Sequence, residues 1–370
     1  MIERMLWHPV ALSADVADKP VGVTLLGEAL VLWRDAQGLT HAWVDKCPHR
    51  GAKLSLGRVQ TSGPEAGAQT RTLECAYHGW QFGGTGQCSL VPALPGFVPP
   101  ASHCVKTYAA REAHGLVWVQ LDTARTALPL LGAALGARLR TVHCGPYEVA
   151  TSAPRVVENF LDMAHFGFVH EGYLGARDSV AMADYTVERT AHGIRATGCR
   201  AWQPQANVQA QGGTQVSYTY EVVSPYCAVL TKVAAGSEGS ELLRTEVAAS
   251  GATAAAAAAA STGGTAKDDA TNVDAQAADW REYIALWVCP ITPETSRVWF
   301  TYAVADFESP DRVLQEFQDT IFLQDKPILE SQSPARLPLD LRAELHTAAD
   351  KASSVYRRYL QDSGITFGVC

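Results

Sequence analysis

Two short segments of the chain each combine one cysteine with one histidine at the spacing of metal ligands. The first reads Cys-Pro-His-Arg-Gly over residues 47–51, and the second reads Cys-Ala-Tyr-His-Gly over residues 75–79. The glycine behind each pair allows the backbone to turn tightly around a metal centre. Each segment offers one thiolate and one imidazole, and the four candidate ligands are Cys47, His49, Cys75 and His78.

Two kinds of metal centre use two cysteines and two histidines. A structural zinc ion can be held by such a set, but zinc fingers usually take both cysteines from one segment and both histidines from the other. A 2Fe–2S cluster of the Rieske type needs two cysteines on one iron and two histidines on the other. Because each segment is mixed here, the spacing favours the cluster. Neutral imidazoles in place of thiolates also make such a cluster easier to reduce.

A second set of ligand-type residues lies further along the chain. Asn159, Asp162 and His165 are spaced by three and would share one face of a helix. His170 follows His165 by five positions, which is about 140° around a regular helix. We therefore expect a π-bulge or a helix end near Gly167, which would let both histidines reach one metal ion.

These segments resemble the motifs of Rieske non-haem iron oxygenases. The two cysteine–histidine segments look like the Rieske fingerprint of ring-hydroxylating oxygenases. Residues 159–170 resemble the Asn-x2-Asp-x2-His-x4-His signature of the same family, position for position. The resemblance implies one Rieske 2Fe–2S cluster and one mononuclear Fe(II) per chain. The cluster would be bound by Cys47, His49, Cys75 and His78, and the Fe(II) by His165 and His170.

The third iron ligand implied by the resemblance is a carboxylate, which completes a facial triad. Residues 322–332 resemble the family's C-terminal ligand segment, which points to Asp325, with Glu330 as the alternative. The resemblance also implies catalytic roles for Asn159 and Asp162. In the implied homotrimer, Asp162 would bridge the two kinds of centre by bonding His165 and, across a subunit boundary, His78 of the neighbour.

Shorter segments narrow the resemblance to caffeine-type N-demethylases and the phthalate-dioxygenase-like group, and they lie at residues 7–10, 90–93, 325–327 and 349–351. The implied function is a terminal oxygenase that hydroxylates or oxidatively demethylates a small aromatic or heterocyclic substrate. It would use O2 and electrons from NAD(P)H, delivered by a reductase or ferredoxin. The alternatives are a cis-dihydroxylating aromatic-acid dioxygenase and a Rieske electron-transfer protein without oxygenase chemistry. An oxygenase would hold about three irons per chain and a carrier about two.

The strands and helices expected around these residues indicate an α+β protein with two domains. Apolar runs at 21–26, 29–33 and 115–121 predict a small all-β Rieske domain over residues 1–125. Residues 126–370 should form an α+β catalytic domain, an antiparallel sheet with helices that carry the iron ligands. We expect its strands at 216–222, 283–288 and 297–302, its helices at 155–170, 312–331 and 339–360, and a disordered, alanine-rich insertion at about 248–270.

The composition narrows the possible partners and the location. The net charge of −8 and the absence of a basic run argue against nucleic-acid binding. No apolar segment reaches the roughly 18 residues of a membrane span, and the first residues lack the apolar stretch of a signal peptide. We therefore expect a cytoplasmic protein without membrane contact. In a reducing compartment the other seven cysteines should be small buried residues, and they are Cys88, Cys104, Cys144, Cys199, Cys227, Cys289 and Cys370.

Overall fold

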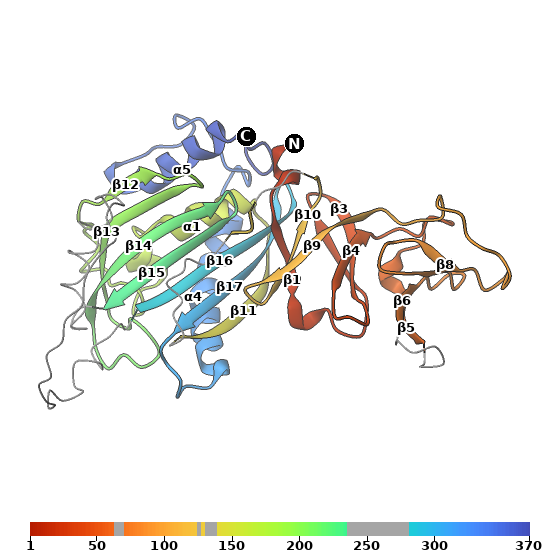
Figure 1. Cartoon of the computed structure of the whole chain (residues 1–370). Helices are drawn as coiled ribbons and strands as arrows, with labels where there is room; N and C mark the ends of the chain where they lie inside the picture. The colour runs from red at the N-terminus through yellow and green to blue at the C-terminus, as the bar shows by residue number, and fades with distance from the viewer. Residues whose placement is uncertain (63–69, 124–126, 130–138, 235–280) are drawn as a thin grey trace, which may run out of the picture.

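The structure, a computed structural model, describes residues 1–62, 70–123, 127–129, 139–234 and 281–370. Within these residues the strands form three sheets, and all their strand pairs are antiparallel. Two sheets belong to the N-terminal third of the chain and the third sheet to the remainder (Figure 1). The α+β prediction is therefore confirmed. The insertion predicted at 248–270 lies outside the described residues.

The six-stranded N-terminal sheet has the order β1-β10-β9-β4-β3-β2. Strands β2 and β3 form a hairpin, and Leu26 and Gly27 between them both have positive φ, 50° and 79°. Such angles form the tight two-residue turn that suits twisted antiparallel strands. The strands are β1 (His8–Leu12), β2 (Val21–Leu25), β3 (Glu28–Arg34), β4 (Thr40–Val44), β9 (Thr107–Ala113) and β10 (Leu116–Gln120), with short 3-10 turns at Ile2–Met5 and Ser13–Asp15.

A smaller four-stranded sheet lies at the far end of the molecule from the helices (Figure 1). It contains β5 (Arg58–Ser62), β6 (Thr70–Glu74), β7 (Gln81–Phe82) and β8 (Cys88–Leu90), and a 3-10 turn precedes it at Leu54–Leu56. Its core is continuous with the larger sheet through Trp33, Trp43 and Phe82, which are at most 1% exposed. The rigid aromatic core fixes the loops that enter and leave β6.

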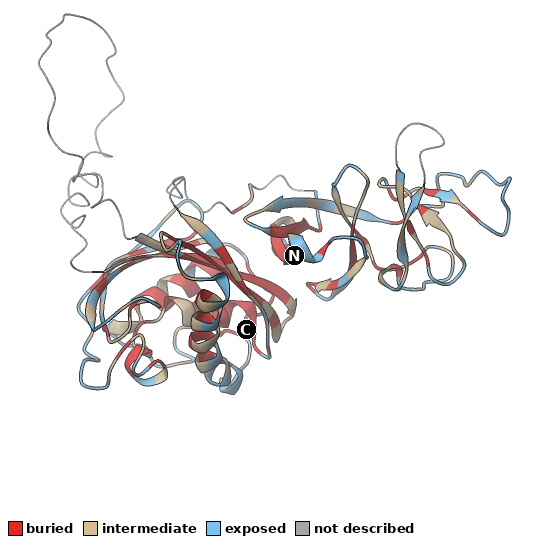
Figure 2. Ribbon diagram, turned by 90° about the horizontal axis from the view of Figure 1, so that it is seen from below, coloured by how far each residue is buried: buried red, intermediate tan, exposed pale blue. Residues whose placement is uncertain are grey.

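The seven-stranded sheet has the order β11-β17-β16-β15-β14-β13-β12 and carries the helices on one face, with buried residues between the two layers (Figure 2). The predicted strands at 216–222, 283–288 and 297–302 are confirmed within β14, β16 and β17. The strands are β11 (Arg140–Val149), β12 (Thr186–Arg189), β13 (Ile194–Gln203), β14 (Thr214–Ser224), β15 (Cys227–Ala234), β16 (Arg281–Thr292) and β17 (Thr295–Val304); the helices are α1 (Ala153–Leu161), α2 (Phe166–Val169), α4 (Asp311–Ser331) and α5 (Lys351–Asp362).

The helix predicted over 155–170 is two helices with a break between them. α1 ends at Leu161, and Asp162 has extended backbone angles, φ −88° and ψ 132°. The Asp162 carboxylate accepts a hydrogen bond from the backbone N–H of Ala164 at 2.8 Å, which stabilises the turn in place of the helix. The shared helix face predicted for Asn159, Asp162 and His165 is therefore wrong. The distortion lies at residues 162–165 and not near Gly167.

The C-terminal helices agree with the sequence only in part. The prediction of a helix at 312–331 is confirmed as α4, whereas the helix predicted at 339–360 begins too early. A 3-10 turn at Ala348–Asp350 leads into α5, and Thr347 with Asp350 forms a capping box before it. The reciprocal bonds of a capping box satisfy the first free N–H groups and thus set where the helix begins.

The N-terminal sheet packs directly on the seven-stranded sheet. Trp118 lies edge-on to Trp287 at a centroid distance of 5.2 Å, and the N–H of Leu26 donates to the carbonyl of Pro290 at 2.8 Å. Among the cysteines, the burial predicted for Cys88, Cys144, Cys199, Cys227 and Cys289 is confirmed, but Cys104 and Cys370 are exposed, because one lies in a surface loop and the other is the last residue. None of the described helices is long and apolar enough to cross a membrane.

Candidate metal centres

The first candidate centre is built by two loops of the same construction. One follows β4 and the other joins β6 to β7. In each loop the cysteine carbonyl accepts an N–H from the glycine four residues later, Gly51 to Cys47 at 2.9 Å and Gly79 to Cys75 at 3.0 Å. Both glycines have positive φ, 76° and 70°, which side chains with a Cβ rarely adopt. This explains why each predicted ligand pair is followed by glycine.

The four predicted ligands of this centre separate into two pairs. Cys47 and Cys75 are each 2% exposed, and their thiol groups interact directly. The rings of His49 and His78 lie 4.6 Å apart, centroid to centroid, nearer the surface. A cluster with one iron on two sulfurs and the other on two imidazoles requires this separation.

A single zinc ion does not fit this arrangement. A tetrahedral ion would bring all four ligand atoms within about 4 Å of one another, given metal–ligand bonds of about 2.0–2.3 Å. Among the described residues, the set of three or more His, Cys, Asp or Glu with ligand atoms all within 4.8 Å of one another is at the second centre. The four residues of the first centre do not form such a set, and a two-iron cluster would hold the cysteines and the histidines on separate irons.

The pKa of the Cys47 thiol, at the sulfur end of this centre, depends on the groups around it. Burial raises the pKa of the Cys47 thiol to about 11; the backbone N–H groups of His49 and Arg50 oppose that rise, and the nearby Cys75 thiol adds to it. Thiolates at this place are therefore stabilised by a bound cation and by these N–H groups. On the imidazole end, His49 stacks on Trp80 at 4.5 Å, and Trp80 stacks on His103 at 5.4 Å. The spacing of the cysteines and histidines gave no sign of this ring stack.

The second candidate centre lies where α1, α2 and α4 meet. His165 precedes α2, His170 follows it, and Asp325 lies on α4. The Nε2 atoms of His165 and His170 are 3.2 Å apart. Asp325 Oδ1 lies 3.4 Å from the first nitrogen and 3.3 Å from the second. A point between the three atoms is roughly 2 Å from each, a typical metal–imidazole bond length, so the three residues fit one metal ion.

Each of these three side chains is oriented by a further hydrogen bond. His165 Nδ1 bonds Asp162 Oδ2 at 2.9 Å, His170 Nδ1 bonds Gln324 Oε1 at 2.9 Å, and Asn159 Nδ2 donates to Asp325 Oδ1 at 3.3 Å. Because an oxygen accepts from Nδ1 of each histidine, Nε2 carries the lone pair toward the metal position. Sequence reasoning missed Gln324, which no local signal distinguishes from the other glutamines of α4.

The two carboxylates weighed as third ligand occupy different places on α4. Asp325 is 7% exposed and faces the histidines. Glu330 accepts the backbone N–H of Ala150 at 2.9 Å and pairs with Lys326, so it stands outside the group of three. The structure therefore brings Asp325, and not Glu330, to the histidines.

The electrostatics of His165 are set by carboxylates on both sides of its ring. Burial disfavours the charged imidazole, but the hydrogen bond with Asp162 and the charge of Asp325 outweigh burial and raise the pKa of His165. The same pairing with His165, against the opposing effect of burial, lowers the pKa of Asp162. This region attracts positive charge, as a cation site should.

A cavity extends from the second centre into the space between the helices and the seven-stranded sheet. It has about 680 Å³ of empty space, and His165, His170 and Asp325 lie in its wall. Most of the other lining side chains are apolar or aromatic. This lining suits a small aromatic molecule. The aromatic lining residues are Phe160, Phe166, Tyr218, Tyr220, Phe300, Tyr302, Phe317 and Phe322.

A second hollow, of about 900 Å³, opens on the other side of His165 and Asp162 toward the surface. The side chain of Asp162 is 30% exposed there. The floor is held by a buried ion-pair network that joins α1 to α5, in which Arg357 Nε donates to Glu158 at 2.6 Å. Sequence reasoning missed this network, because its partners are far apart in the chain.

Comparisons with known proteins agree with this architecture. Residues 6–109 match the Rieske [2Fe-2S] domain, and residues 149–363 match the vanillate O-demethylase oxygenase C-terminal domain. The chain is 29% identical to the methylxanthine N1-demethylase NdmA of Pseudomonas putida over 367 residues, which cover 97% of this chain and 88% of that protein. It is 35% identical to the probable methylxanthine N7-demethylase NdmC of Pseudomonas sp. (strain TJI-51) over 263 residues, 70% of this chain and 79% of that protein.

A solved structure extends the similarity to three dimensions. Pseudomonas putida CBB5 NdmA with caffeine matches the fold with a TM-score of 0.72 at 28% identity, over 97% of this chain and 90% of that one. The family matches cover both domains, one with a Rieske cluster and one with oxygenase chemistry. The chain therefore belongs to the Rieske non-haem iron oxygenases, in the family that shares the vanillate O-demethylase oxygenase C-terminal domain.

Proposed function

We propose that this oxygenase removes a methyl group from nitrogen or oxygen on a small heteroaromatic substrate. The observation that carries the proposal is the convergence of His165, His170 and Asp325 at the wall of an apolar, aromatic-lined cavity. The relatives named as methylxanthine demethylases support the choice of a methyl group as the target.

We assign the site residues by their geometry. His165, His170 and Asp325 would hold the mononuclear iron, and Cys47, Cys75, His49 and His78 would hold the cluster. With their iron bound, the two centres would activate O2, using electrons that a reductase or ferredoxin supplies. Asn159, Gln324 and Asp162 orient the iron ligands and thus act as positioning residues.

The remaining protein contribution is binding and water exclusion. The aromatic wall would hold the substrate ring with its methyl group toward the three ligand residues. The overall reaction consumes the N–CH3 or O–CH3 compound, O2, two electrons and two protons. It yields the N–CH2OH or O–CH2OH product and water, and that product then releases formaldehyde and leaves N–H or O–H.

Electron transfer in this proposal uses a homotrimer. The first centre lies in loops beside the four-stranded sheet and the second lies among α1, α2 and α4, toward opposite sides of Figure 1. His78 is exposed, and Asp162 lines a surface hollow. In a ring of three chains, His78 of one subunit would enter the hollow of the next and bond Asp162. We further propose a domain boundary near residue 125 and a cytoplasmic location.

The test is turnover with a product balance. The purified oxygenase, loaded with iron and sulfide and supplied with a reductase, is given NADH and N- or O-methylated aromatic compounds. We expect formaldehyde and demethylated product in equal amounts, with about three irons per chain. A cis-diol without formaldehyde would replace demethylation by the dioxygenase alternative. About two irons per chain with no oxygenated product from any compound would favour the electron carrier.

A further inference from the structure

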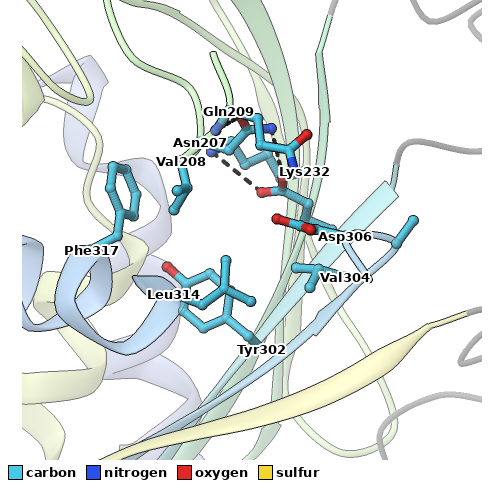
Figure 3. Close-up of a pocket in the computed structure, with 11 residues that line it drawn as sticks. Asn207, Val208, Gln209, Lys232, Tyr302, Val304, Asp306, Leu314 and Phe317 are labelled. Carbon is cyan, nitrogen blue, oxygen red and sulfur yellow. Dashed lines mark hydrogen bonds and ion pairs between the residues drawn. The ribbon is translucent and has the colours of Figure 1, made fainter. Parts of the chain in front are cut away.

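A small cavity beside the one at the second centre has its charged lysine already paired. Figure 3 shows Lys232 and Asn207 on one side of this cavity, opposite Leu314. The Lys232 ammonium lies 3.6 Å from the carboxylate of Glu282 and donates to the carbonyl of Ala206. Glu282 in turn accepts from Asn207 Nδ2 at 2.9 Å. These groups satisfy one another, so they need no further ligand.

A surface loop of the Rieske domain, residues 91–103, is apolar and exposed. It follows β8 at the end of the molecule farthest from the helices (Figure 1). The loop contains no Asp, Glu, Lys or Arg, whereas the whole chain has a net charge of −8. Leu94, Phe97 and Val98 are 58%, 40% and 86% exposed. Exposed apolar side chains gathered in one place often mark a site of protein–protein contact.

The shape of this loop is fixed before any partner binds. The N–H of Phe97 donates to the carbonyl of Leu94 at 2.9 Å, and the carbonyl of His103 accepts from the N–H of Cys88 at 2.8 Å. Proline rings restrict the backbone between these bonds. The prolines of the loop are Pro92, Pro95, Pro99 and Pro100. A surface that is already ordered loses little conformational freedom when a partner binds, which favours its use for docking.

A row of aromatic rings joins this loop to the cluster ligands. The rings of Phe97 and His103 lie 5.8 Å apart, centroid to centroid. His103 stacks on Trp80 and Trp80 stacks on His49, with an angle of 5° between the rings in both pairs. The exposed Phe97 is thus connected to a cluster ligand through ring contacts. Because electron transfer slows steeply with distance, an electron donor that docks on this loop has a short path to the cluster.

The two histidine ligands of the cluster have different surroundings. His49 contacts the ring stack that leads to the apolar loop. His78 lies beside the exposed ring of Tyr77, at a centroid distance of 3.9 Å, and in the proposed homotrimer it bonds Asp162 of the next subunit. One histidine is therefore placed for the entry of electrons and the other for their exit.

We propose that the loop of residues 91–103 is the docking surface for the electron-donor protein, and that His103 and Trp80 carry its electrons to His49. The partner is a reductase or ferredoxin whose iron–sulfur centre lies beside an apolar surface. In each transfer one electron leaves the reduced iron–sulfur centre of the partner and reduces one ferric iron of the cluster, and no bond forms or breaks. The inference depends on the family and not on the substrate, so a failure to find demethylation leaves it in place.

Binding of the partner to the full-length, metal-loaded protein tests the docking surface. The probe is the oxidised form of the NADH-dependent iron–sulfur reductase that supports turnover, and calorimetry gives its Kd. Phe97→Ser combined with Val98→Ser should raise this Kd at least about tenfold, because two apolar side chains leave the interface. The matched control is Phe307→Ser, a change at a phenylalanine that is 63% exposed on the catalytic domain, and it should leave the Kd unchanged. A wild-type Kd in the double variant overturns the proposal.

Docking of the reductase must also be distinguished from a contact between copies of this chain. Light scattering of the Phe97→Ser and Val98→Ser double variant should give the oligomeric state of the wild type. The visible absorption of its cluster should also be unchanged, because the backbone bonds of the loop do not need these side chains. Loss of the oligomer together with a raised Kd would assign the loop to the subunit contact and overturn the proposal.

Stopped-flow reduction of the cluster separates the electron path from docking. His103→Ala keeps Phe97, Val98 and the backbone bond to Cys88, so the Kd of the reductase should stay within about twofold of the wild type. At saturating reductase the cluster should be reduced several-fold more slowly, while dithionite should reduce it at the wild-type rate. His103→Phe restores a flat ring on Trp80 and should recover the rate. A wild-type rate in His103→Ala, or a loss that His103→Phe does not recover, overturns the role of the stack.

Discussion

The two metal centres of this chain are built in different ways. All four candidate ligands of the first come from two neighbouring loops between residues 47 and 78, and their glycines set the loop shape. The second takes two histidines from a break between helices and an aspartate from α4, far along the chain. The first centre can therefore be recognised from local spacing alone, whereas the second depends on how α4 packs against α1.

The centres also differ in what surrounds their ligands. Around Cys47 the stabilising N–H groups belong to the backbone of its own loop, from His49 and Arg50. Around the second centre the supporting groups are side chains from three elements, Asn159, Asp162 and Gln324. At the second centre, single substitutions of these supporting side chains can therefore change metal binding and activity by degrees. At the first centre, single substitutions mainly remove a ligand.

The largest effect should follow from removing a cluster ligand. Cys47→Ser should abolish turnover and the visible absorption of the cluster, because a buried hydroxyl replaces a thiolate. Iron content should fall from about three to about one per chain, since the second centre is assembled separately. Cys104→Ser, which alters an exposed cysteine, is the control and should keep all the iron. Loss of all iron in Cys47→Ser would show that the centres are not independent.

Removal of the carboxylate ligand should impair the second centre and leave the cluster intact. Asp325→Ala should lower turnover at least about a thousandfold, because two imidazoles alone hold Fe(II) weakly. The cluster spectrum should stay as in the wild type. Glu330→Gln changes the other acidic residue of the same helix and should retain the mononuclear iron. If Glu330→Gln loses that iron instead, the assignment of the third ligand is wrong.

An intermediate effect is expected at the residue proposed to join the centres. Asp162→Asn should reduce turnover by about a hundredfold or more while iron content and cluster spectrum stay normal, because the link to His165 loses its charge. Stopped-flow spectroscopy should show slow oxidation of the reduced cluster. Asp178→Asn, an exposed aspartate nearby in the sequence, should behave as wild type. Normal cluster oxidation in Asp162→Asn would refute the bridging role.

The smallest effect should come from Gln324. Gln324→Leu removes the acceptor for His170 Nδ1 and should weaken Fe(II) binding about tenfold, the lower end for such supporting groups. Competition with a chelator measures the change. Gln315→Leu is a control on the same helix, where the glutamine bonds a backbone carbonyl of β11. Equal losses in both variants would point to a general weakening of α4.

Much of the fold and of the site is visible in the sequence for physical reasons. Strand β14 alternates buried and outward residues, and this period is readable without a structure. The cysteine–histidine spacing identifies the first centre because loop geometry is local. The exposure of Cys104 and Cys370 could not be predicted in this way, because the burial of a lone cysteine depends on which other segments cover it.

The features that the sequence did not predict depend on distant contacts. Helical periodicity continues past Leu161, so the break at Asp162 was invisible until its carboxylate was seen to cap Ala164. Likewise, nothing next to Gln324 in the sequence distinguishes this residue, because its role is defined by the position of His170.

The break at residues 162–165 also bears on attempts to make the enzyme more heat-resistant. A common strategy replaces poor helix formers by alanine or glutamate, and a reading of sequence alone would select this segment as the middle of a helix. Continuing α1 through it would rotate His165 away from His170. Thermostability designs should therefore leave these four positions unchanged and work on exposed positions of α5.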